Sequence, residues 1–199
     1  MNINETLKHY FGYDSLRPGQ QELIEGILQR KDVLGIMPTG AGKSLCYQVP
    51  ALMLDGITIV VSPLISLMTD QVKALNQAGV HAAYINSSLT ENQIRTALFY
   101  AAQGRYKIIY VAPERLNTIR FLEFACQVDI SMVTVDEAHC ISQWGQDFRP
   151  SYVGIADFLA QLPKRPVVSA FTATATERVK QDIMKSLRLQ NPVTVVTGF

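Results

Sequence analysis

The stretch Val-Leu-Gly-Ile-Met-Pro-Thr-Gly-Ala-Gly-Lys-Ser, residues 33–44, decides the fold of this chain. Its apolar start, Val33–Met37, is typical of a buried strand, and residues 45–54 after it have helical spacing. The glycines between them let backbone amides approach anionic oxygens closely, and the N-terminus of the following helix favours negative charge. The stretch therefore predicts a strand, a phosphate-binding loop and a helix, in that order.

Each residue of this loop has an expected role toward a nucleotide. Lys43 would bridge the terminal phosphates and Ser44 would ligate Mg²⁺. Met37 departs from the general pattern, which has a glycine at that position. The alternative is an ordinary strand–turn–helix with a chance Gly-Lys-Ser, but the flanking strand and helix patterns favour the phosphate loop. The residues expected to contact the nucleotide here are Thr39, Gly40, Ala41, Gly42, Lys43 and Ser44.

A second chemical signal is Asp136-Glu137-Ala138-His139, which follows the apolar run Met132–Val135. A carboxylate at a strand end can hold Mg²⁺ opposite Ser44, and Glu137 can polarise the attacking water. Two acidic residues at a strand end are, on their own, more often a solvated turn. Together with the phosphate loop, Asp136 and Glu137 indicate an enzyme that hydrolyses nucleoside triphosphates.

Short β-branched runs alternate with helical patterns along the whole chain. Strands buried on both faces read as continuous apolar runs, so the runs predict a mostly parallel sheet. The alternation implies right-handed crossovers and a three-layer α/β domain. Up to about residue 30 the chain is expected to be a helical, peripheral appendage, and residues 31–199 to form the main domain. The expected strands are Val33–Met37, Ile57–Val61, Ala82–Ile85, Lys107–Val111, Met132–Val135, Val167–Phe171 and Val193–Val196.

Two helix starts are predicted at the ends of strands. Ser62-Pro63 places a hydroxyl at an N-cap position and proline at the first helical position. Thr174-x-x-Glu177 has the spacing of a capping box. Both would lie on the edge where open α/β sheets bind ligands.

Composition excludes several classes of protein. The 199 residues suit one domain, and a net charge of +1 neither supports nor excludes a nucleic-acid partner. Cys46, Cys126 and Cys140 are far apart and match neither a zinc framework nor a disulfide scaffold. This cysteine pattern favours a reducing cytosol, so a cytoplasmic location is expected. The sequence also contains neither a signal-peptide pattern nor an apolar run long enough to span a bilayer.

The motifs together resemble those of a known family. Thr-Gly-x-Gly-Lys-Ser combined with Asp-Glu-Ala-His is similar to the Walker motifs of superfamily 2 helicases, a variant that tolerates Met37. From about Phe11 onward the chain resembles the RecQ DNA helicases in particular. The segments that carry this resemblance are residues 13–20 (adenine recognition), 60–68 (motif Ia), 110–116 (motif Ib), 140–150 (an aromatic-rich loop) and 171–174 (motif III).

This resemblance implies roles for individual residues. Tyr13 would stack on adenine, while Arg17 and Gln20 would hydrogen-bond it; a plain helix start at Arg17-Pro18-Gly19-Gln20 is the alternative. His139 would act with the catalytic residues and relay the nucleotide state to the second domain. Thr172 would have the coupling role that motif III plays in the family. In the aromatic-rich loop, Gln143, Trp144, Phe148 and Arg149 would contact DNA, because exposed aromatics beside an arginine suit base stacking and phosphate contact. Alternatively, Trp144 anchors the loop in the core.

The resemblance also implies the larger setting. The chain would be the first RecA-like domain of a helicase that moves 3′-to-5′ on DNA in repair or recombination and binds ATP and Mg²⁺, with no zinc expected in this part. Its partners would be single-stranded and duplex DNA and a second RecA-like domain, which is absent from the sequence along with zinc-binding and winged-helix regions. Alone it is expected to be a nearly inactive monomer. An RNA helicase, or a nucleotide-gated DNA-binding scaffold, are the alternatives; a bacterial protein would associate with the nucleoid.

Overall fold

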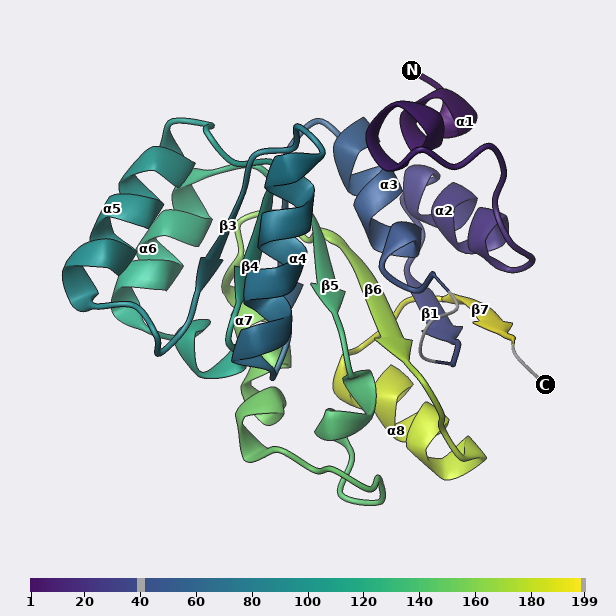
Figure 1. Ribbon diagram of the computed structural model, residues 1–199. Helices are drawn as coiled ribbons and strands as arrows, with labels where there is room; N and C mark the ends of the chain where they lie inside the picture. The colour runs from purple at the N-terminus through teal and green to yellow at the C-terminus, as the bar shows by residue number, and fades with distance from the viewer. Residues whose placement is uncertain (39–41, 198–199) are drawn as a thin grey trace.

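A computed structural model describes residues 1–38 and 42–197 of the chain. Its centre is a seven-stranded sheet in the order β3-β4-β2-β5-β6-β1-β7, and each pair of neighbouring strands is parallel (Figure 1). The strands are β1 (Val33–Ile36), β2 (Ile57–Val61), β3 (Ala82–Ile85), β4 (Ile108–Val111), β5 (Ile130–Val135), β6 (Val167–Thr172) and β7 (Val193–Val196). The seven predicted strands and the parallel sheet are confirmed, with bounds that agree to within two residues.

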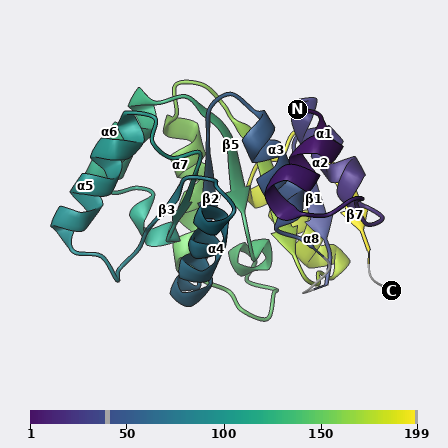
Figure 2. The same ribbon diagram turned by 45° about the horizontal axis from the view of Figure 1, so that its top comes forward.

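Helices cover both faces of this sheet. Four helices pack on one face: α5 (Glu91–Ala102), α6 (Ile119–Gln127), α7 (Ile155–Gln161) and α8 (Glu177–Ser186). The other face is covered by α2 (Gln20–Leu28), α3 (Leu45–Met53) and α4 (Ile65–Gln77). Figures 1 and 2 show α5 and α6 together beside β3, and α1 to α3 gathered at the opposite end of the sheet. The predicted three-layer α/β architecture is confirmed.

Side chains of one strand serve both layers because they alternate across the sheet. In β4, Ile108 and Tyr110 join the core beneath α2, α3 and α4, whereas Ile109 and Val111 join the core beneath α5 to α8. All four side chains are buried. This double burial explains why the sequence of each strand is a continuous apolar run.

The N-terminal segment consists of α1 (Ile3–Thr6), a π-helical turn η1 (Leu7–Phe11) and then α2. Leu7 packs against Ile24 and Val49 in a small cluster outside the two main layers. In contrast, α2 buries Leu23 and Ile27 in the main core. The segment is therefore helical as expected, but its last helix forms part of a layer of the domain.

Both predicted helix starts are displaced. The amide of Ser62 still donates to the Val111 carbonyl at 3.3 Å, so the chain remains in the sheet there and α4 begins only at Ile65. The Ser62 hydroxyl is buried without a hydrogen-bond partner among the described residues. At α8 the N-cap is Thr176, whose side chain accepts from the Val179 amide, and not Thr174. The predictions that Ser62 and Thr174 cap helices are wrong.

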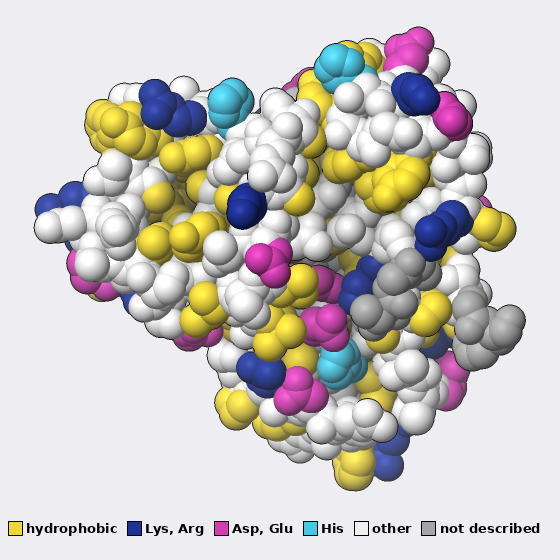
Figure 3. All heavy atoms as spheres, in the orientation of Figure 1, with side chains coloured by type: hydrophobic (Ala, Val, Ile, Leu, Met, Phe, Trp, Pro, Cys, Tyr) yellow, Lys and Arg dark blue, Asp and Glu magenta, His cyan; other side chains and the backbone are white. Residues whose placement is uncertain are grey.

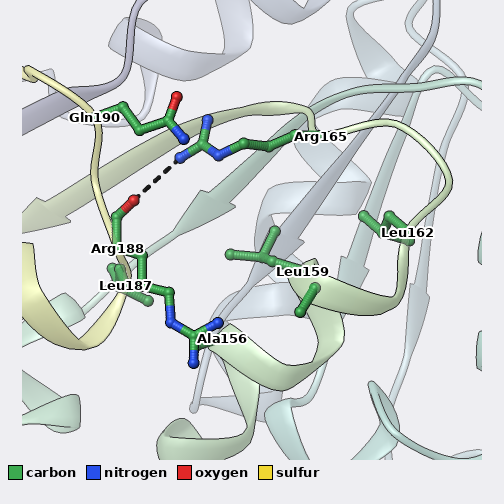
Figure 4. A pocket seen from close by; sticks show the side chains of 8 residues that line it. Ala156, Leu159, Leu162, Arg165, Leu187, Arg188 and Gln190 are labelled. Atoms are coloured by element: carbon green, nitrogen blue, oxygen red, sulfur yellow. Dashed lines mark hydrogen bonds between the residues drawn. The ribbon is translucent and has the colours of Figure 1, made fainter.

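An ion pair between a buried carboxylate and an exposed guanidinium lies at the amino-terminal edge of the sheet. Asp32, which precedes β1, accepts two hydrogen bonds from the Arg165 guanidinium at 3.0 and 2.6 Å. Arg165 also donates to the Arg188 carbonyl, and a cavity of about 260 Å³ lies beside it (Figure 4). Leu159, Leu162 and Leu187 supply the apolar part of its wall. This hollow lies at the opposite edge from the predicted phosphate loop, because Asp32 and Arg165 precede the strands that the loop and motif III follow.

Candidate nucleotide site

The topology brings the sequence motifs to one edge of the sheet. In the order β5-β6-β1, the three strands that lead to Asp136, motif III and the phosphate loop are neighbours. Since all of them are parallel, their carboxyl ends meet at the same edge, where open α/β sheets bind ligands. Figure 3 shows acidic, basic and histidine side chains gathered near the middle of the face it displays. The predicted loop residues Thr39, Gly40 and Ala41 lie outside the described residues.

Lys43 lies between the two predicted carboxylates. Its Nζ is 3.1 Å from Asp136 Oδ1 and 3.3 Å from Glu137 Oε1. Burial lowers the pKa of Lys43, but the charges of Asp136 and Glu137 more than offset this, so its pKa lies above the ordinary value. Burial raises the pKa of Asp136, and the Lys43 ammonium opposes that rise. The three groups form one electrostatic unit, which brings residues of the two sequence motifs together.

The backbone around Asp136 is held by a residue that sequence reasoning missed. The buried Tyr152 hydroxyl donates to the Asp136 carbonyl at 2.8 Å. The Asp136 carboxylate accepts from the Glu137 amide at 2.9 Å, and Glu137 itself has a left-handed backbone with φ 51°. A non-glycine residue in that region is uncommon and is found where surrounding contacts fix it. The turn therefore presents the Asp136 and Glu137 side chains in a defined orientation.

His139 and Thr172, which the resemblance assigned to coupling, contact each other. The Nδ1 atom of His139 is 2.8 Å from the Thr172 Oγ1 atom and 3.5 Å from Glu137 Oε2. Thr172 is buried at the end of β6, and its hydroxyl also donates to the Thr174 carbonyl at 3.2 Å. The end of β6 is thus connected to Glu137 through one imidazole ring.

Gln20 connects the predicted adenine motif to the phosphate loop. Its side-chain amide donates to the Gly42 carbonyl at 3.0 Å and accepts from the Arg17 amide at 2.7 Å. Gly42 has φ +75°, a backbone conformation that favours glycine, and a side chain there would displace the Gln20 amide. Tyr13 is 54% exposed and available for stacking. A helix does begin at Gln20, but Pro18 precedes its N-cap, Gly19, and is therefore outside the helix.

Polar residues of α3 tie the helix after the phosphate loop to the sheet. The Tyr47 hydroxyl is 2.8 Å from the Tyr110 hydroxyl of β4, and Gln48 donates to Tyr110 at 3.0 Å. Gln48 also donates to Gln71 of α4 at 2.9 Å. Burial raises the pKa of Tyr47 and of Tyr110, so both stay neutral hydroxyls. Sequence reasoning did not identify this network, because no local pattern links residues on three elements.

The aromatic-rich loop leaves the site through Cys140 and projects from the domain. Cys140 is buried, and burial raises the pKa of its thiol to about 12, so it is a neutral packing residue. Trp144 is 60% exposed, so it does not anchor the loop in the core, which was the alternative to a DNA contact. Phe148 is partly buried and Gln143 exposed, and Arg149 pairs with Asp147 at 3.3 Å.

Comparison with known proteins identifies the family. The DEAD/DEAH box helicase family matches residues 17–183. The chain belongs to this family. Its resemblance to RecQ helicases is confirmed: it is 53% identical over 194 residues to the ATP-dependent DNA helicase RecQ of Bacillus subtilis, covering 97% of this chain and 33% of that protein. It is also 46% identical to the RecQ helicase of Pasteurella multocida, covering 98% of this chain and 31% of the relative. The helicase domain thus spans about a third of these curated relatives.

Solved structures support the fold. A hypothetical ATP-dependent RNA helicase from Sulfolobus tokodaii superposes with a TM-score of 0.74 at 22% identity, over 99% of this chain and 57% of that one. The Hef helicase domain of Pyrococcus furiosus gives 0.69 at 18% identity, over 98% and 40%. These likenesses establish the RecA-like fold of the helicase domain. None of the helices formed by its described residues combines the length and apolar character needed to cross a membrane.

Proposed function

We propose that this helicase domain is the first RecA-like, ATP-binding domain of a RecQ-type DNA helicase, with residues 1–30 carrying the adenine motif. The observation that supports it most is the contact of Lys43 with Asp136 and Glu137 at the sheet edge. The names and 46–53% identity of the RecQ relatives support DNA as the polymer. In this proposal the parent protein moves 3′-to-5′ on single strands and unwinds duplexes in the cytoplasm, at the nucleoid if it is bacterial.

The residues at this edge suit Mg·ATP. Mg²⁺ prefers hard oxygen ligands, and the Ser44 hydroxyl and the Asp136 carboxylate supply them from two adjacent segments. Bound Mg²⁺ would neutralise charge on the phosphates. Lys43 would bind the terminal phosphates, since its ammonium is protonated and lies next to the Asp136 carboxylate that would hold Mg²⁺. Tyr13, Arg17 and Gln20 would hold adenine, and Gln20 would report its presence to the phosphate loop through Gly42.

Hydrolysis in this scheme depends on Glu137. Its carboxylate would orient the attacking water and accept its proton. His139 contacts both Glu137 and Thr172, so movement of motif III or of the aromatic-rich loop would change the position of that carboxylate. Gln143, Trp144, Phe148 and Arg149 would contact the DNA. A second RecA-like domain would supply a catalytic arginine, worth ~10³–10⁵ in rate in related phosphoryl transfers.

The test is ATP turnover by a helicase that joins this domain to its second motor domain, measured with single-stranded DNA and with RNA of matched length. We expect DNA to stimulate turnover more than RNA, and Glu137→Gln to abolish the stimulated rate. Greater stimulation by RNA would support an RNA helicase instead. ATP binding without stimulation by either polymer would support a nucleotide-gated scaffold.

A further inference from the structure

The exposed indole of the aromatic-rich loop has one face covered by an arginine from a distant element. The Arg178 guanidinium carbon lies over the Trp144 ring, 3.3 Å from the ring centroid. Such a separation is well within the range of cation–π attraction. Trp144 is nevertheless 60% exposed, so the face opposite Arg178 is open to solvent. The pair presents one free aromatic face backed by a cation.

Arg178 is placed by a rigid part of the domain. It lies in the first turn of α8, whose start is capped by Thr176 and whose Val179 and Ile183 are buried in the core. A helix fixed in this way holds its side chains more firmly than an exposed loop can. The loop that carries Trp144, by contrast, lies beside a cavity of about 430 Å³, which His139 and Thr174 also line. Arg178 is therefore the fixed member of the pair, and the loop is the member that it positions.

The same helix adjoins the catalytic residues. It follows β6, which ends at Thr172, and Thr172 contacts His139. In addition, α8 packs against η3 (Ala138–Ile141), which contains His139. The stacked pair thus connects the loop to η3, whose His139 contacts Glu137, and to the segment after β6, whose Thr172 contacts His139.

We propose that Arg178 is a positioning residue for DNA: it holds the Trp144 ring so that a base of a single strand stacks on the ring's open face. This inference rests on the proposed function, because it concerns how the same loop meets its polymer. The planar guanidinium covers the back of the ring, which an ammonium cannot do equally well. The base would then be clamped against a surface that the core of the domain supports, rather than against a free loop.

Trp144 is the only tryptophan in the chain, so its fluorescence reports this contact directly. In Arg178→Ala, quenching of that fluorescence by neutral acrylamide should rise, because the covered face becomes accessible. Lys180→Ala is the matched control, since it removes a cation one half-turn further along α8 that pairs with Glu177 at 3.9 Å. Quenching in Arg178→Ala equal to that in Lys180→Ala would overturn the proposal.

The second readout is DNA-stimulated ATP turnover in the helicase that contains both motor domains. Arg178→Ala should raise the DNA concentration for half-maximal stimulation about two- to fivefold, the size of an exposed cation–π contact. Basal turnover and the salt dependence should stay unchanged, and Arg178→Lys should not restore the wild-type value. If Arg178→Lys restores it and Arg178→Ala lowers the salt slope by about one, Arg178 is a phosphate contact and the proposal is wrong. Absence of DNA stimulation in the unsubstituted helicase would instead overturn the proposed function, while the acrylamide result would still decide the Arg178–Trp144 contact.

Discussion

At the residue scale, the site depends on one cation between two carboxylates. The Lys43 and Asp136 side chains are only 14% and 9% exposed. Water therefore cannot solvate either charge well when its partner is removed. This makes substitutions at the unit sharper tests than substitutions of exposed charges, which are worth little.

Lys43→Ala and Glu137→Gln should separate binding from chemistry. Loss of the Lys43 cation should abolish both ATP binding and turnover, because the phosphates would face two carboxylates without a counter-charge. Glu137→Gln should retain ATP binding and lower turnover by about 10²–10⁴-fold, because an amide cannot accept the proton. Equilibrium ATP binding and steady-state turnover measure the two effects, with exposed Lys73→Ala as the control. Wild-type turnover in Glu137→Gln would refute its assigned role.

Asp32 should matter for stability and not for nucleotide binding. Its carboxylate accepts from Arg165 and from the amides of Val168 and Gln190, and it is 2% exposed. Asp32→Ala should therefore lower the free energy of unfolding by about 1–3 kcal/mol, because the buried Val168 amide loses its acceptor, whereas the exposed Arg165 stays solvated. Urea unfolding measures this, and exposed Asp70→Ala should change it by less than about 0.5 kcal/mol. Equal effects of the two substitutions would contradict the structural role.

At the scale of elements, the segment after β6 sets both the start of α8 and the place of Arg178. Thr176→Ala should lower the free energy of unfolding by about 1 kcal/mol, because the Val179 amide loses its side-chain acceptor. Thr174→Ala is the matched control, since Thr174 is two residues earlier and does not cap the helix. Thermal or urea unfolding of both variants decides the matter, and a larger loss in Thr174→Ala would restore the capping box expected from the sequence.

The aromatic-rich loop should act as a coupling element. Replacing Trp144 or Phe148 by alanine should leave ATP binding intact in the absence of DNA and reduce DNA-stimulated turnover, because base stacking supplies ~1–3 kcal/mol per base. The loop begins at Cys140, directly after His139, so its position can affect the catalytic turn. Unchanged stimulation in both variants would show that these rings do not transmit DNA binding.

At the scale of the whole molecule, the sheet and its two helical layers form a closed core, so the chain should fold as a monomer. It should bind Mg·ATP weakly and hydrolyse it very slowly, because two arginines near its sheet edge already contact other groups and do not act as the catalytic arginine. Arg149 pairs with Asp147, and Arg178 stacks on Trp144. Sedimentation and a steady-state ATPase assay on the 199-residue chain, with and without single-stranded DNA, test this. Robust DNA-stimulated turnover by the chain alone would mean that it contains its own catalytic arginine.

The sequence by itself determined the strands and the places of Lys43 and the acidic turn along the chain, because each is encoded by contiguous residues. Apolar runs such as Ile57–Val61 identify doubly buried strands wherever they lie in the sheet. The glycines, Lys43, Asp136 and Glu137 are likewise legible from type and spacing alone. Helix starts were less so: Ser62 has the residue type of a cap, but its amide is held in the sheet by Val111.

Only the tertiary structure decided which distant residues meet. The strand order places β6 between β5 and β1, and this order brings Thr172 to His139, 33 positions earlier in the chain. It also brings Arg165 to Asp32, 133 positions apart. The contacts of Tyr152 with Asp136 and of Arg178 with Trp144 arise in the same way. No local pattern encodes such pairs, because their free energy depends on side chains that approach only after the sheet has formed and its faces have been covered.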